Sequence, residues 1–157
     1  MTTKRIPLAL TLGCLLAFAG LCAGQGTAKG KASGGLRIKI YFYHEPGEYI
    51  DISPVTRRIR TAAPARAAIE ALLKGPTVEE VKLGFDGMAS AGEFRIGSLR
   101  ISRGVARVNF VSRPGWAGFP GDIAPARFKK AVELTLKQFP SVRRVVVSLD
   151  GDLHFET

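Results

Sequence analysis

The two histidines of this 157-residue chain are the side chains best suited to proton transfer near neutral pH. His44 precedes Glu45 at the end of an apolar run, and His154 follows two aspartates close to the C-terminus. General acid–base catalysis needs such a group held against a partner in a cleft. We expect both histidines to be polar residues at strand ends. The sequence also contains no Gly-x-Ser-x-Gly elbow and no phosphate-binding glycine loop before a helix, so we predict no enzyme, no catalytic residue and no cofactor.

Carboxylates near the C-terminus raise the question of a metal site. Asp150-Gly151-Asp152, with Glu156 nearby, brings carboxylates close together. A calcium loop requires oxygen ligands at closely spaced alternate positions around a sharp turn. Here Asp-Gly is also the dipeptide favoured in a two-residue hairpin turn, and Leu153 and Phe155 have a strand-like alternation. We predict a turn and no metal.

The segment 112–121 is rich in glycine and proline and carries the single tryptophan, Trp116, beside Phe119. Exposed aromatic side chains in such a loop make good anchors for a partner. Alternatively, Trp116 folds back and covers the end of the core. An aromatic platform beside Asp122 also suggests a wall-modifying, carbohydrate-active enzyme, but glycosidases usually need two facing carboxylates, and only one is evident.

Basic residues exceed acidic ones by 23 to 13, which gives a formal net charge of +10. Arg37, Lys39, Arg100 and Arg107 occupy the non-core positions of three predicted strands. If those strands are neighbours, these side chains form a positive sheet face that would dock to an acidic protein, an anionic wall polymer or lipid headgroups. The alternative is a solvated face on which the arginine stems cover apolar surface.

The N-terminus resembles an export signal. Lys4 and Arg5 precede an uncharged apolar run, Ile6–Ala23, that ends in small residues. We predict a signal peptide over 1–23, followed by a flexible linker over 24–35; the alternatives are a retained N-terminal anchor or lipidation at one of the two cysteines, both of which lie in the run. An exported chain is not expected to bind nucleic acid.

The apolar periodicity predicts the elements of one domain, residues 36–157. Alternation over 36–43 indicates a half-buried strand, and spacings of three and four indicate helices over 64–74 and about 123–139. Further strands are predicted over 49–55, 96–102, 105–111, 145–149 and 153–155, with a short helix after the capping box that begins at Thr77. About five strands and two main helices favour an α+β two-layer sandwich, with both helices on one sheet face.

Four segments resemble the GerMN domain family of sporulation and spore germination proteins. They are IKIYF at Ile38–Phe42, IEALLKGPT at Ile69–Thr77, LRISRGVARVNF at Leu99–Phe110 and TLKQFPSVRRVVVSLDG at Thr135–Gly151. The resemblance implies a small α/β sandwich similar to the ring-building motifs of secretion and sporulation complexes. It implies a non-catalytic role outside the cytoplasmic membrane, in assembly or binding to an envelope protein or to further copies of the chain.

Overall fold

The computed structural model describes residues 35–45, 51–87 and 92–155, which all belong to one unit, Ser33–Thr157. The predicted signal peptide and nearly all of the predicted linker lie outside the described residues. In chain order the elements are β1 (Leu36–His44), β2 (Asp51–Ile59), α1 (Pro64–Leu73), α2 (Val78–Lys82), β3 (Phe85–Asp86), β4 (Phe94–Ser102), β5 (Val105–Ser112), α3 (Ala124–Lys137) and β6 (Arg144–Leu149). Within this part of the chain, no helix is long and apolar enough to cross a membrane.

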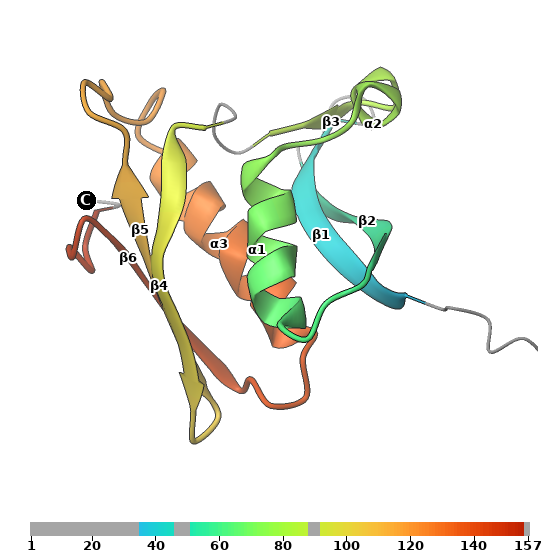
Figure 1. Cartoon of the computed structure of the whole chain (residues 1–157). Coiled ribbons are helices and arrows are strands. Elements are labelled where there is room, and N and C mark those ends of the chain that lie inside the picture. Colours follow the sequence, from blue (N-terminus) through green and yellow to red (C-terminus); the bar gives the residue numbers. More distant parts are fainter. Residues whose placement is uncertain (1–34, 46–50, 88–91, 156–157) are drawn as a thin grey trace, which may run out of the picture. The chain divides into compact units, whose positions relative to one another are not determined.

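Two three-stranded sheets enclose α1 and α3 (Figure 1). One sheet has the order β2-β1-β3, and the other has the order β4-β5-β6, in which β5 and β6 are parallel. The predicted α+β class is confirmed. The arrangement differs from the predicted one, because the helices pack against two sheets and not against one.

The two sheets follow from the apolar faces of β1 and β5, each of which must be buried against the helices. β1 buries Ile38, Ile40 and Phe42, whereas β5 buries Ala106, Val108 and Phe110. Each set lies on one face of a three-stranded sheet, and α1 and α3 between them cover both sets (Figure 1). The buried stripe of α3 comprises Phe128, Ala131, Val132, Thr135 and Leu136.

A bulge at Gly97 changes the phase of β4. Its register with β5 shifts between Ile96 and Ser98, so Phe94 and Ile96 are buried before the bulge, while Leu99 faces the core after it. A Cβ at position 97 would lie 2.8 Å from Cγ2 of Val111, which explains the glycine. As predicted, the face of Leu99 is also the face of buried Val108, its partner on β5.

The two predicted tight turns are confirmed, but one predicted strand is wrong. Arg103 and Asp150 have φ of 49° and 51°, and the glycine after each also has a positive φ, as a type I′ turn requires. After the second turn only a single bridge, Leu149 to Asp152, is formed, and no strand follows over 153–155. The ring of Phe155 instead stacks at 6.1 Å on that of Phe119.

The end of α3 occupies part of the free edge of β1. The side-chain amide of Gln138 accepts a hydrogen bond from the backbone N–H of Lys39 at 2.7 Å and donates one to the carbonyl of Lys39 at 2.7 Å. The hydroxyl of Thr135 accepts from the N–H of Tyr41 at 3.3 Å. Side chains of a helix therefore satisfy backbone groups that a neighbouring strand would otherwise pair.

Candidate binding surface

The four predicted binding cations lie on two different sheets. Arg37 and Lys39 are on β1, whereas Arg100 and Arg107 are on β4 and β5. A face shared by all four required β1 to neighbour the later strands, and the structure does not meet this condition, because β1 belongs to a different sheet from β4 and β5. The outer faces of the two sheets point away from the helices on opposite sides (Figure 1).

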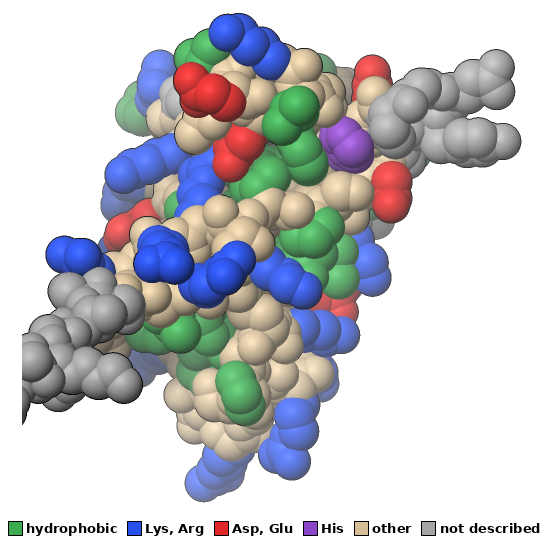
Figure 2. All heavy atoms as spheres, turned by 90° about the vertical axis from the view of Figure 1, so that its right-hand side faces the viewer, with side chains coloured by type: hydrophobic (Ala, Val, Ile, Leu, Met, Phe, Trp, Pro, Cys, Tyr) green, Lys and Arg blue, Asp and Glu red, His purple; other side chains and the backbone are tan. Residues whose placement is uncertain are grey.

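The first basic surface, the β1–β2 face, contains Arg37, Lys39 and Arg58, all exposed. Arg37 lies directly opposite Arg58 in the antiparallel register. Figure 2 shows this side of the molecule, with lysine and arginine side chains gathered around its middle. Tyr41 and Pro54 form another opposed pair on the same face, so the surface is partly apolar.

The second basic surface, the β4–β6 face, has the stronger charge. It consists of the outward-facing residues of β4, β5 and β6, and its cations are Arg95, Arg100, Arg107 and Arg144. None of these three strands contains an aspartate or a glutamate. Arg143 lies close to the β4–β5 turn and adds charge there, since its backbone N–H donates to the carbonyl of Gly104 at 2.8 Å.

Arg100 and Arg107 form a directly opposed pair at the centre of the β4–β6 face. Like charges at opposed positions destabilise a sheet, because the side chains extend from Cβ atoms only about 5 Å apart. Among the described residues, neither arginine forms an ion pair. The face therefore presents guanidinium groups that are available to an external anion.

Trp116 and Phe119 cover the end of the core. The ring centroid of Trp116 lies 4.9 Å from that of Phe94 and 5.1 Å from that of Phe119. Phe119 also lies 5.7 Å from Phe128 of α3. Both side chains are half-buried against the core, the arrangement that we weighed against an exposed interface loop. Their role in partner binding stays a prediction.

His44, considered for catalysis, and Asp150, considered for metal binding, both have structural contacts. His44 stacks on Phe85 with centroids 4.3 Å apart, and its Nε2 lies 3.1 Å from the carbonyl of Leu83. The carboxylate of Asp150 accepts hydrogen bonds from the N–H and the hydroxyl of Ser112, at 3.1 and 2.6 Å. In the described ranges, no three His, Cys, Asp or Glu side chains cluster as metal ligands would.

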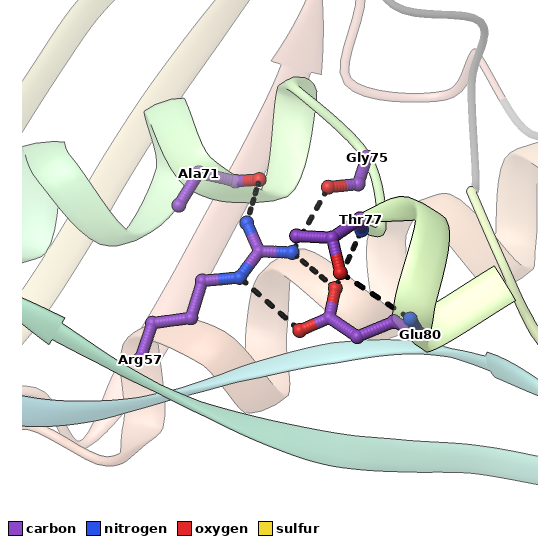
Figure 3. A network of polar contacts seen from close by, with 5 residues as sticks. All are labelled: Arg57, Ala71, Gly75, Thr77 and Glu80. Carbon is purple, nitrogen blue, oxygen red and sulfur yellow. Dashed lines mark hydrogen bonds and ion pairs between the residues drawn. The ribbon is translucent and has the colours of Figure 1, made fainter. Parts of the chain in front are cut away.

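Sequence reasoning missed a polar network that centres on Arg57 (Figure 3). Its guanidinium donates to the carbonyls of Ala71 and Gly75, at 3.3 and 3.1 Å, and pairs with Glu80 at 2.5 Å. It also lies over the ring of Phe42, 5.3 Å from the centroid. Arg57 thereby joins β2 to the C-terminal end of α1 and to α2. The capping box predicted from Thr77 was the available signal, since it showed that Glu80 had a defined position.

The pKa of Glu80 reflects this network. Burial raises the pKa of this carboxyl. Hydrogen bonds from Arg57 and Thr77, together with the charge of Arg57, lower the pKa by more than burial raises it, so that it lies below the ordinary 4.5. Glu80 accepts the N–H of Thr77 at 2.7 Å, and the Thr77 hydroxyl accepts the N–H of Glu80 at 3.3 Å. This carboxylate therefore stabilises the fold, and the network is structural.

Comparison with known proteins identifies the family. A family model named Germane and described as "Sporulation and spore germination" matches residues 39–154, so the chain belongs to this family. The resemblance seen in the four sequence segments is thus confirmed. No curated protein sequence matches the chain.

Solved structures show the same fold. The tandem GerMN domains of the sporulation protein GerM from Bacillus subtilis superpose with a TM-score of 0.61 at 20% identity, over 82% of this chain and 43% of that chain. The first GerMN domain of the same protein gives 0.56 at 22% identity, over 74% of this chain and 84% of that chain. This chain therefore spans less than half of the tandem structure and corresponds to a single GerMN domain.

Proposed function

We propose that this chain is a non-catalytic docking module of the bacterial cell envelope, which binds an acidic surface of a partner protein through the β4–β6 face. The observation that supports it is the opposed pair Arg100 and Arg107 on a sheet whose strands carry no acidic residue. An external carboxylate would remove the repulsion between the two guanidinium groups and would form charge-assisted hydrogen bonds with them. Membership of a sporulation and germination family fits an assembly role. The predicted export signal supports a position outside the cytoplasm.

The charge of the chain favours a different protein over a second copy. A net charge of +10 opposes the approach of another identical surface. Anionic wall polymer and lipid headgroups have compatible charge, and the experiment below separates them from a protein. The strand register sets the spacing of the arginine Cα atoms, and this suits a partner that carries several carboxylates.

The test is crosslinking of the full-length chain in its native envelope. A photoreactive residue replaces exposed Ser98 on the β4–β6 face, and a matched probe replaces exposed Thr56 on the β1–β2 face. We expect a discrete crosslinked band from position 98 that is lost in the double variant Arg100→Glu, Arg107→Glu, and no such band from position 56. A diffuse product that wall hydrolases remove would indicate polymer. The absence of any product at position 98 would contradict the proposal.

A further inference from the structure

A groove runs along the open edge of β4, between that strand and α1. Two cavities make it up, with volumes of about 530 and 390 Å³, and Arg66 of α1 lines both. The first lies between Glu70 and Leu73 of α1 and the start of β4. The second lies at the other end of the strand, where Leu99, Ile101 and Phe139 provide apolar walls. Both cavities are large enough to hold apolar side chains.

The backbone of β4 is available on the side of this groove. β4 pairs with β5, and within the described residues no strand pairs with its other edge. Every second residue of an edge strand directs its N–H and C=O away from the sheet, where they can pair with another chain. The edges of the other sheet offer fewer free backbone groups than β4 does. Gln138 occupies part of the edge of β1, and Pro54 lacks the backbone N–H that an added strand would pair with on β2.

We propose that this groove binds an extended segment of a partner protein, which adds a strand to β4 and inserts alternate apolar side chains between β4 and α1. The inference rests on the proposed docking function and specifies the chemistry of the partner. From Phe94 to Ile101 the open edge comprises eight residues, which at ~3.3 Å per residue corresponds to a partner strand of similar length, roughly 25 Å. Backbone hydrogen bonds supply affinity in such a complex, and the pockets select side chains.

Charge at one end of the groove specifies the sequence of that segment. Arg66 is paired with Glu70 at 3.0 Å, but in the described part of the chain Lys74 and Arg95 form no ion pair. Both line the first cavity. The partner segment therefore carries an aspartate or glutamate at this end and apolar residues near Ile101, which is 37% exposed.

The same charges argue against a second copy of this chain as the occupant. Pairing β4 with β4 of another molecule would bring a second Arg95 and a second Arg100 to the same sheet. Like charges across adjacent strands are destabilising. The occupant is thus a partner with acidic residues.

The test uses a phage-displayed library of random peptides, selected on the full-length chain. We expect enriched peptides to alternate apolar residues and to carry an acidic residue at one end. Ile101→Glu and Arg95→Glu should each weaken a selected synthetic peptide about tenfold or more. Matched controls at exposed positions elsewhere, Leu153→Glu and Arg58→Glu, should leave the affinity unchanged.

Hydrogen exchange supplies an independent measurement. The bound peptide should protect amide protons of β4 and leave those of β2 unchanged. If Ile101→Glu lowers the urea midpoint, Ser141→Trp replaces it, since Ser141 is an exposed residue at the mouth of the second cavity and its enlargement blocks the groove. Binding that survives both Ser141→Trp and Arg95→Glu, a lack of enrichment, or protection outside β4 would overturn the inference.

The two proposals fail separately. If the crosslink from position 98 depends on Arg100 and Arg107 while Ile101→Glu and Ser141→Trp, both at the second cavity and off the β4–β6 face, have no effect on it, the docking face stands and the groove inference is wrong. If groove variants abolish peptide binding and the crosslink ignores both arginines, the groove binds a partner and the assignment of the β4–β6 face is wrong.

Discussion

Arg100 of β4 and Arg107 of β5 lie directly opposite each other at the centre of a sheet that has no acidic residue on any strand. Arg37 and Arg58 form an equivalent pair on the other sheet. The fold thus retains two repulsive pairs on its outer faces. Repulsion of this kind lowers the stability of the free protein and is relieved by a bound anion.

Reversing the charge of Arg107 should have opposite effects on the stability of the protein and on partner binding. We expect Arg107→Glu to raise the free energy of unfolding by about 0.5 kcal/mol, because it converts a like-charge pair into an opposite-charge pair. The same variant should lose the crosslink formed at position 98. Arg58→Glu is the matched control, which should give a similar gain in urea unfolding and keep the crosslink. A loss of stability in Arg107→Glu would contradict the electrostatic argument.

Removal of Arg57 should have the largest effect on stability of any single charged residue in the described structure. Arg57→Ala removes the guanidinium donor from the carbonyls of Ala71 and Gly75, and it leaves the carboxylate of Glu80 with the N–H of Thr77 but without its cation. We expect a loss of about 2–3 kcal/mol in urea unfolding, and little rescue by Arg57→Lys, because an ammonium group lacks the planar fork. Arg66→Ala is the control, since it breaks only an exposed helix pair and should cost about 0.5 kcal/mol or less.

The pH dependence of stability should report Glu80. Its pKa is lowered in the folded chain, so its contribution is fully present above the ordinary 4.5 and is lost as the pH falls through the folded value. The stability difference between the wild type and Glu80→Gln should therefore be largest above pH 4.5 and shrink below it. Unfolding in urea at a series of pH values measures this. A difference that grows towards low pH would refute the assignment.

The bulge in β4 should not tolerate a side chain. In Gly97→Ala the new Cβ would lie 2.8 Å from Cγ2 of Val111 and 3.1 Å from Nδ2 of Asn109, so these residues must shift. We expect a loss of about 1–3 kcal/mol in thermal or urea unfolding. Ser98→Ala, at the next and exposed position, should change the stability by less than about 0.5 kcal/mol.

Trp116 distinguishes core covering from partner binding. Trp116→Ala removes the ring contacts with Phe94 and Phe119. We expect a loss of about 2 kcal/mol in stability, because the side chain is only partly buried, and an unchanged crosslink at position 98. The single tryptophan also makes wild-type fluorescence a direct probe of unfolding. Unchanged stability together with a lost crosslink would instead identify Trp116 as an interface anchor.

Most helices, strands and turns could be predicted from local patterns in the sequence. The errors concern which strands pair with each other. Alternation along 36–43 and the Arg103-Gly104 turn concern neighbours in the chain, so each could be predicted. The division into two sheets depends on which strands pair, and alternation is the same whichever partner is chosen.

The candidate surfaces follow the same rule. The outward positions of the four candidate cations, Arg37, Lys39, Arg100 and Arg107, could be assigned from alternation, but their separation onto two faces could not. The Arg57 network also escaped prediction, because its partners on α1 and α2 are brought to it only by tertiary packing. The strand predicted over 153–155 does not form, and the ring of Phe155 stacks instead on Phe119. This residue lies in a loop distant in the sequence, so the contact could not be predicted from local patterns.

The amide of Gln138 presents to Lys39 the same donor and acceptor as a peptide group. The side-chain amide at the end of α3 therefore occupies the position at which another β-strand would pair with β1. Strand addition along this part of β1 is thereby blocked within each molecule. A strand from a partner is therefore expected to add at another edge of the domain and not along this part of β1.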